Sequence, residues 1–290
     1  MSPDACAWHG LSAEEHELQY NPQRAVPTFR DNQARREPLN AAANAALLPV
    51  RDIAYGPDPQ ETLDLYPAHL GAPVHVFFHG GYWRAQDKAN FAFIAEALVR
   101  QGVTAAIANY PLCPRVTLDD VVRAARACVG WVLGHATQHG ADPKTLTLSG
   151  HSAGAHLVAA VLADPTLAPQ VKGALLISGI YDPAPAALTS VNADLHLTQD
   201  QIRRCDFERA PPHARCPVWI AAGGREPVHW IDQSFRYARH LHRHGLDPGV
   251  LVLPGYHHFD VIDQYADADS ELMRCLAKLV ARQGGAAAAT

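Results

Sequence analysis

The sequence contains no long apolar segment and no excess of basic residues. No run of about 18 consecutive apolar residues occurs, so no transmembrane helix is predicted. The first 22 residues lack both a basic n-region and an apolar h-region, so we expect a soluble, cytoplasmic protein and no membrane partner. A net charge of −5 provides no basic stripe for a phosphate backbone, which argues against nucleic acid as a partner.

The cysteines show no pattern of a disulfide or metal framework. There are six, with no C-x-x-C pair: Cys6, Cys113, Cys128, Cys205, Cys216 and Cys275. Cys128 and Cys275 fall among apolar residues at helical spacing, where a free thiol acts as a small hydrophobic side chain. We therefore expect buried or incidental thiols, no metal and no cofactor.

What the chain does contain is an alternation of strand-like and helix-like segments. Most of the strand-like segments are continuous apolar runs, as expected for strands covered on both faces of a parallel sheet. Six such segments stand out: 74–78, 103–109, 145–148, 173–178, 218–222 and 249–253. Segments with helical spacing lie between most of them, so the sequence predicts an α/β fold with a mostly parallel sheet flanked by helices.

Two of the predicted helices have clear apolar stripes. One stripe consists of Leu118, Val122, Ala125, Val129 and Val132. Thr117 is its expected N-cap, with Asp120 placed to complete a capping box. The other stripe runs through 272–280, close to the carboxyl end of the printed sequence.

Two regions interrupt this alternation within what we expect to be a single domain of residues 1–290. Residues 1–50 have helical and loop-like character, with a capping-box signal at Ser12 and Glu15. Residues 182–216 are polar and contain prolines, and we expect this insertion to form a small partial cap over one edge of the sheet.

The strongest chemical signal is Gly150-His151-Ser152-Ala153-Gly154. It follows the strand-like TLTL and precedes the helical HLVAAVLA, which is the context that gives a G-x-S-x-G match its meaning. A sharp strand-to-helix turn holds the serine hydroxyl above the sheet, and small residues on either side prevent a clash between the two arms of the turn. Ser152 is therefore the predicted nucleophile. The alternative without a catalytic role is a glycine-rich turn in which the serine is incidental.

A serine hydroxyl needs a base to take its proton, and 17 histidines are available. His258 lies in the loop after the last strand-like segment, from which it could reach back over the sheet to Ser152. His257 is the rival for this role. A pair of adjacent histidines also raises a metal interpretation, but no H-x-x-x-H or H-x-E signature accompanies this pair.

The acid that orients the base should follow the strand-like PVWIAAGG, which gives the chain order serine, acid, histidine. Glu226 stands at that place. The alternative for Glu226 is a non-catalytic, solvated glutamate of the loop that pairs with Arg225. Asp232 and Asp182 are the fallback acids.

The tetrahedral intermediate of acyl transfer also requires backbone N–H donors, which are worth about 3–4 kcal/mol each. The N–H of Ala153 is one candidate. The loop His79-Gly80-Gly81-Tyr82-Trp83 leaves a predicted strand, and the N–H groups of Gly80 and Gly81 are candidates there, with that of Tyr82 as a further option. We expect His79 to hold this loop by hydrogen bonding rather than to act as an acid or base.

With these residues placed, the chain resembles the α/β-hydrolases of the hormone-sensitive-lipase-related group, and within it the kynurenine formamidase (arylformamidase) branch. General esterases of the group carry H-G-G-G, whereas H-G-G-Y-W at 79–83 is the form typical of the formamidases. Further matches are GHSAGAHL at 150–157, SGIYDP at 178–183, Gln233-Ser234, and HFD at 258–260. The likeness begins near QYNP at 19–22 and covers nearly the whole chain.

The resemblance implies Ser152 as nucleophile, His258 as base, and the loop at Gly80 and Gly81 with Ala153 as oxyanion hole. One departure is that the family acid is usually aspartate, whereas Glu226 stands here and is followed by Pro227. Glutamate serves this role in other α/β-hydrolases, so a Ser-His-Glu triad is expected.

The implied reaction is metal-free hydrolysis of N-formyl-L-kynurenine to kynurenine and formate. Tyr82 and Trp83 are expected to form part of a flat wall for the aromatic ring, although Trp83 could instead be a core residue below the loop. Arg84 or a basic residue of the 182–216 insertion could meet the substrate carboxylate.

The alternatives are a carboxylesterase for small aryl or alkyl esters and a binding protein that has lost catalysis. A homodimer is left open.

Overall fold

The computed structural model describes residues 10–284 of the chain. In this part, one eight-stranded sheet has the strand order β1-β2-β4-β3-β5-β6-β7-β8. The strands are β1 (Val50–Ala54), β2 (Thr62–Tyr66), β3 (Ala72–Phe78), β4 (Thr104–Ala108), β5 (Ala141–His151), β6 (Gly173–Ile177), β7 (Val218–Gly223) and β8 (Gly249–Leu253). From β4 to β8 every neighbouring pair is parallel, whereas β2 runs antiparallel to both β1 and β4. The predicted α/β class is therefore confirmed.

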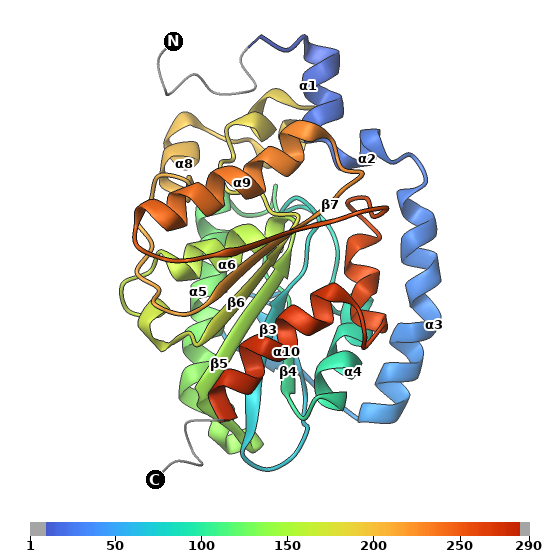
Figure 1. Cartoon of the computed structure of the whole chain (residues 1–290), viewed down its shortest axis with the longest axis vertical. Helices are drawn as coiled ribbons and strands as arrows, with labels where there is room; N and C mark the ends of the chain where they lie inside the picture. Colours follow the sequence, from blue (N-terminus) through green and yellow to red (C-terminus); the bar gives the residue numbers. More distant parts are fainter. Residues whose placement is uncertain (1–9, 285–290) are drawn as a thin grey trace.

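Helices cover both faces of this sheet (Figure 1). One face packs against α5 (Leu118–His135), α6 (Ala153–Leu162) and α9 (Val228–Arg243). The other packs against α4 (Ala92–Arg100) and α10 (Glu271–Gly284). Burial on both faces explains why the central strands are continuous apolar runs rather than alternating ones. No helix in residues 10–284 has the length and apolar character needed to cross a membrane.

The capping signals at the start of two helices are confirmed. The side chain of Thr117 accepts the backbone N–H of Asp120, whose carboxylate accepts the Thr117 N–H, so two N–H groups at the start of α5 have side-chain partners. The same reciprocal arrangement joins Ser12 and Glu15 at α1 (Ala13–Tyr20). The five apolar residues predicted for the α5 stripe are all buried.

The amino-terminal helices lie along one side of the molecule (Figure 1). After α1 come α2 (Pro22–Ala25) and the long α3 (Phe29–Leu47), which packs against α4. Within 182–216 the chain forms the 3-10 helix η4 (Pro185–Leu188) and the short helices α7 (Asn192–Leu195) and α8 (Gln199–Arg204). This segment packs against α1, where Ser190 donates hydrogen bonds from its backbone N–H (2.8 Å) and its hydroxyl (2.5 Å) to the Glu17 carboxylate.

Parallel pairing brings the carboxyl ends of β3, β5, β7 and β8 to one edge of the sheet. Phe78 at the end of β3 pairs with Gly150 of β5, and Gly223 at the end of β7 pairs with Leu253 of β8. The loops that follow these strands carry the four sequence signals described above, so the fold itself assembles them. Ligand sites of open parallel sheets lie at this edge.

Candidate active site

Ser152 sits on a strained turn between β5 and α6. Its φ of 56° and ψ of −119° are unfavourable for a residue with a Cβ, and the surrounding structure must hold the turn in place. The Ser152 N–H donates to the carbonyl of Ile177 on the neighbouring β6 at 2.8 Å. The side chain is thereby presented at the start of α6, as the G-x-S-x-G signal predicts.

The flanking glycines are required by the closeness of the two arms of this turn. A Cβ on Gly150 would lie 2.3 Å from the backbone of Gly154. One on Gly154 would lie 1.9 Å from the carbonyl oxygen of Phe78, at the end of β3. The turn is thus packed against β3 with no room for a side chain at either position.

A chain of hydrogen bonds joins Ser152, His258 and Glu226. Oγ of Ser152 lies 3.0 Å from Nε2 of His258, and Nδ1 of His258 lies 2.6 Å from Oε1 of Glu226. All three side chains are buried, with 3%, 3% and 6% of each residue exposed. Since a carboxylate only accepts, Nδ1 carries the imidazole proton and Nε2 is free to accept the serine proton.

The rival residues face elsewhere. Nδ1 of His257 accepts the backbone N–H groups of Phe259 and Asp260 in its own loop. Asp232 forms an ion pair with Arg236 at 3.0 Å on α9. Asp182 accepts the backbone N–H of Ala184. None of these side chains takes part in the hydrogen-bond chain at Ser152 in the described residues, and Glu226 is buried against His258 rather than solvated.

Burial controls the charge states of the triad. Burial raises the pKa of the Glu226 carboxyl, while hydrogen bonds donated by the Gly223 N–H (2.8 Å) and the Ser178 hydroxyl (2.9 Å) oppose this rise. Burial also lowers the pKa of His258 below its ordinary value, with a smaller electrostatic contribution from His257. The imidazole is therefore neutral at pH 7 and in the form that accepts a proton.

The loop after β3 lies directly against the nucleophile. A Cβ on Gly80 would lie 3.1 Å from Cβ of Ser152 and 3.0 Å from Nδ1 of His151, so any side chain here would be tightly packed against the nucleophile. Gly81 has a φ of 109°, a conformation that side chains disfavour. No hydrogen bond within residues 10–284 uses the backbone N–H groups of Gly80, Gly81 or Ala153. These donors are free to bind an oxyanion next to Ser152.

The prediction that His79 holds this loop is confirmed. Nδ1 of His79 lies 2.7 Å from the carbonyl oxygen of Gly80, and Nε2 lies 3.2 Å from Oδ1 of Asn109. The ring stacks between Tyr110 and Phe91, with centroid distances of 4.4 and 5.7 Å. The Tyr110 hydroxyl also donates to the His79 carbonyl at 2.8 Å, so the loop is held from two sides.

Tyr82 and Trp83 do not form the expected wall for a substrate ring. Both belong to the packed core, with 8% and 0% of each residue exposed, and neither lines the cavity at the triad. Their φ angles of 54° and 56° turn the chain inward, so the Tyr82 hydroxyl donates to the carbonyl of Tyr20 and the Trp83 ring packs against His156. The core alternative considered for Trp83 is the correct one, and the expectation for Tyr82 is corrected likewise.

The cavity at the triad is instead bordered by other aromatic and polar residues. Next to the triad it is lined by the buried residues Gly80, His151 and His258 and by the half-buried Gly81. The remaining lining residues are Gln23, Phe29, Gln33, Arg36, Ala85, Gln86, Asn90, Phe91, Phe259 and Ile262. The cavity has a volume of about 70 Å³ and includes His258 but not Ser152 among its lining residues. Gln23 and Gln33 are exposed, so the cavity opens beside α2 and α3.

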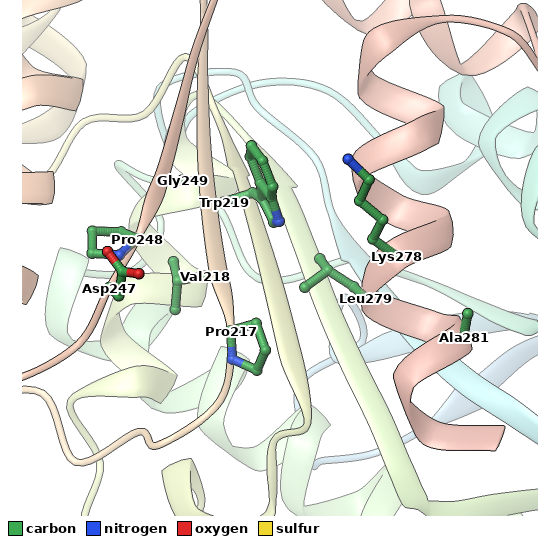
Figure 2. Close-up of a pocket in the computed structure, with 9 residues that line it drawn as sticks. All are labelled: Pro217, Val218, Trp219, Asp247, Pro248, Gly249, Lys278, Leu279 and Ala281. Carbon is green, nitrogen blue, oxygen red and sulfur yellow. The ribbon is translucent and has the colours of Figure 1, made fainter. Parts of the chain in front are cut away.

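A larger cavity of about 600 Å³ lies at the opposite end of the sheet (Figure 2). It is bordered by the first residues of β7 and β8 and by the last turns of α10, where Lys278 lies 5.7 Å from the centre of the Trp219 ring. No member of the triad lines it. In residues 10–284 no group of three or more His, Cys, Asp or Glu residues is arranged to hold a metal ion.

Two participants were not found from the sequence. Ser178 was noted only as part of SGIYDP, although its position directly after β6, beside the β7 loop, could have suggested a contact with the acid. Arg36 gave no sequence signal, because its proximity to the triad depends on how α3 packs against the loop after β8. Arg84, a candidate for the substrate carboxylate, forms an ion pair with Asp194.

The fold and the placement of these side chains define a serine hydrolase. A family model described as the alpha/beta hydrolase fold matches residues 75–260. Kynurenine formamidase of Danio rerio is 30% identical over 95% of this chain and 99% of its own length. The Drosophila melanogaster kynurenine formamidase is 31% identical over 71% and 72% of the two chains. A solved structure of a protein from Silicibacter sp. TM1040, described as a provisional thioesterase, is 25% identical. The similarity covers 91% of this chain and 97% of that chain, with a TM-score of 0.79.

The chain therefore belongs to the α/β-hydrolase family, in the branch that contains the kynurenine formamidases.

Proposed function

We propose that this serine hydrolase cleaves the formamide bond of N-formyl-L-kynurenine through Ser152, His258 and Glu226. The observation that carries the proposal is the unbroken hydrogen-bond chain from Oγ of Ser152 through His258 to Glu226, next to three free N–H donors. The choice of a formamide rests on the relationship to kynurenine formamidases over nearly the whole chain. The reaction yields kynurenine and formate.

The first half of the reaction transfers the formyl group to the enzyme. As Oγ of Ser152 attacks the formyl carbon, Nε2 of His258 takes the serine proton. The N–H groups of Gly80, Gly81 and Ala153 bind the oxyanion, and Glu226 stabilises the imidazolium. The tetrahedral intermediate then breaks its C–N bond, and His258 gives its proton to the departing aryl amine.

The second half returns the enzyme to its starting state. Water attacks the formyl ester of Ser152 while His258 takes one of its protons. The new tetrahedral intermediate expels the serine oxygen, which recovers its proton from His258, and formate leaves. In these steps Ser152 supplies the nucleophile, His258 moves the protons and the backbone N–H groups stabilise the oxyanion, and no atom changes its oxidation state.

The cavity at the triad indicates how the two parts of the substrate would lie. The formyl group is placed at the end of the cavity beside Gly80 and His258, and the amine must extend toward the exposed end near Gln23 and Gln33. We also propose that residues 1–290 act as one domain, in which 182–216 forms a partial cap together with α1. The hydrogen bonds between Ser190 and Glu17 support this arrangement.

The proposal is tested by steady-state kinetics with N-formyl-L-kynurenine and p-nitrophenyl acetate. We expect the kcat/KM for the formamide to exceed that for the ester. A kcat/KM for the formamide far below that for the ester would favour the carboxylesterase alternative. Ser152→Ala should lower both activities by at least about 10³-fold, because the attacking atom is removed; activity like that of the wild type in this variant would refute the mechanism.

A further inference from the structure

The cavity at the triad has one wall that comes from outside the part of the chain matched by the family model. That wall is α3, which lies beside α4 along one side of the molecule (Figure 1). Phe29, Gln33 and Arg36 of α3 border the same cavity as Gly80 and His258. An amine leaving group that extends from the triad toward the opening therefore passes α3.

Arg36 is the one arginine or lysine that borders this cavity in residues 10–284. It is buried, with 8% of the residue exposed. Nε donates to Oδ1 of Asp263 at 2.6 Å, and Nη2 donates to the backbone carbonyl of Phe259, the residue after the base. These two bonds fix the plane of the guanidinium group beside the cavity.

The third nitrogen of this group is not used. No hydrogen bond within the described part of the chain involves Nη1 of Arg36. Nη1 is not one of the fully buried side-chain atoms that lack a partner in residues 10–284, so its N–H groups are accessible from the cavity rather than enclosed in the protein. The free N–H groups fit an anionic oxygen, for which arginine forms strong, charge-assisted hydrogen bonds.

Aromatic side chains border the cavity close to Arg36. Phe29 and Phe259 have ring centroids 5.2 Å apart, and Phe91 lies deeper in the site. Together they offer apolar surface for an aryl ring, in the role that the sequence assigned to Tyr82 and Trp83. The polar partners of the opposite wall are Gln86 and Asn90, which are joined by a hydrogen bond of 3.0 Å.

We propose that Arg36 is a specificity-determining residue, and that its free N–H groups bind the carboxylate of an N-formyl aryl amine that carries an amino-acid side arm. Phe29 and Phe259 flank the aryl ring between this carboxylate and the formyl group at Ser152. This inference rests on the proposed function, since it names the part of that substrate which α3 recognises.

Binding of the reaction product tests the proposal independently of catalysis. Isothermal titration calorimetry compares L-kynurenine with kynurenamine, which has the same aryl amine and side-arm amine but lacks the carboxylate. The wild type should bind kynurenine at least tenfold more tightly. Arg36→Gln should remove most of this preference, and Arg36→Lys should retain part of it. Arg35→Gln, which changes an exposed arginine on the same helix, is the matched control and should keep the preference.

Equal affinity of the wild type for kynurenine and kynurenamine would overturn the proposal without any variant. Kinetics supply the second readout: Arg36→Gln should lower kcat/KM for N-formyl-L-kynurenine about 10- to 100-fold, mainly through KM. Its effect on N-formylkynurenamine should be at least tenfold smaller. An equal loss on both substrates would mean that Arg36 only supports the Phe259 backbone. Failure of the proposed function is distinct, because the wild type would then hydrolyse neither formamide efficiently.

Discussion

At the scale of single residues, the acid of the triad is held by more than its histidine. Oε2 of Glu226 accepts the backbone N–H of Gly223 and the hydroxyl of Ser178, while Oε1 accepts Nδ1–H of His258. Three donated hydrogen bonds favour the ionised carboxylate, and burial disfavours it. Glu226 therefore depends on these hydrogen bonds to remain charged at a buried position.

Removal of one of these donors should shift the pH dependence. In Ser178→Ala the carboxylate loses a hydrogen bond, so the pKa of Glu226 rises further and the triad takes up its inactivating proton at a higher pH. The acid limb of the kcat/KM profile should therefore move upward by about one pH unit. Ser234→Ala, at a buried serine whose hydroxyl has no partner in the described residues, is the control. An unmoved or lowered limb in Ser178→Ala would contradict this account.

The identity of the acid is tested by amide substitutions. Glu226→Gln keeps the size of the side chain but replaces one carboxylate oxygen by an NH2 group, which donates hydrogen bonds. If this group faces His258, it favours the imidazole tautomer whose Nδ1 lacks the proton, so that Nε2 cannot accept the serine proton. We expect kcat to fall by about 10³- to 10⁴-fold. Asp232→Asn should change kcat little, because Asp232 is paired with Arg236 on α9. The assignment is wrong if the two variants show the reverse order of kcat values.

At the scale of elements, two turns at the carboxyl edge of the sheet are built as one unit. The β5–α6 turn places Gly154 against the carbonyl of Phe78, and the loop after β3 places Gly80 against Ser152. Since Gly154 leaves no room for a Cβ and Gly80 leaves very little, the two turns pack directly against each other. The backbone donors and the nucleophile thus keep a fixed relation.

Tyr110 provides a test of whether the position of the loop after β3 depends on the hydrogen bond from the Tyr110 hydroxyl to the His79 carbonyl. In Tyr110→Phe the hydrogen bond to the His79 carbonyl is lost, so the Gly80 and Gly81 donors are held less firmly. We expect kcat to fall about tenfold with little change in KM, since the oxyanion exists only after attack. Tyr66→Phe, which removes a hydroxyl bonded to Asn44 at 2.9 Å, should leave kcat unchanged. A loss carried by KM alone would refute the positioning role of Tyr110.

The elements that the sequence predicted are those with strong local signals. The six apolar segments correspond to β3 through β8, because strands covered on both faces require uninterrupted apolar runs. The strands β1 and β2 were missed. Four of the five residues of β1 are exposed and one is intermediate, so no apolar pattern marks it, and its pairing is set by β2 alone.

The part of the candidate site that depends on the order of strands and loops along the chain could be predicted from the sequence. Ser152, Glu226 and His258 follow β5, β7 and β8, which are parallel strands of one sheet, so their loops must meet at one edge. The orientation of Tyr82 and Trp83 depends instead on two left-handed backbone conformations at non-glycine residues, which no sequence pattern signals. Arg36 was missed for a similar reason, since a tertiary contact between α3 and the loop after β8 brings it to the site.

At the scale of the whole molecule, two apolar cores lie on opposite faces of the sheet. Leu118 of α5 belongs to one and Leu276 of α10 to the other, and both are fully buried. We expect Leu118→Ala and Leu276→Ala each to lower the free energy of unfolding by about 2–5 kcal/mol. The double variant should equal the sum within about 0.5 kcal/mol, since the residues share no cluster.

Denaturant unfolding measures these free energies. A strongly non-additive double variant would mean that the sheet transmits packing changes from one core to the other. In that case the description of two separate cores would be wrong.

The central claim is that the whole arrangement serves a carbonyl at Ser152, specifically that of an aryl formamide. The most direct measurement is the kcat/KM of the wild type for N-formyl-L-kynurenine beside that for p-nitrophenyl acetate, with Ser152→Ala assayed in parallel. The account predicts a higher kcat/KM for the formamide and a loss of at least about 10³-fold on both substrates in the variant. A formamide kcat/KM far below that for the ester, or a fully active Ser152→Ala, would contradict it.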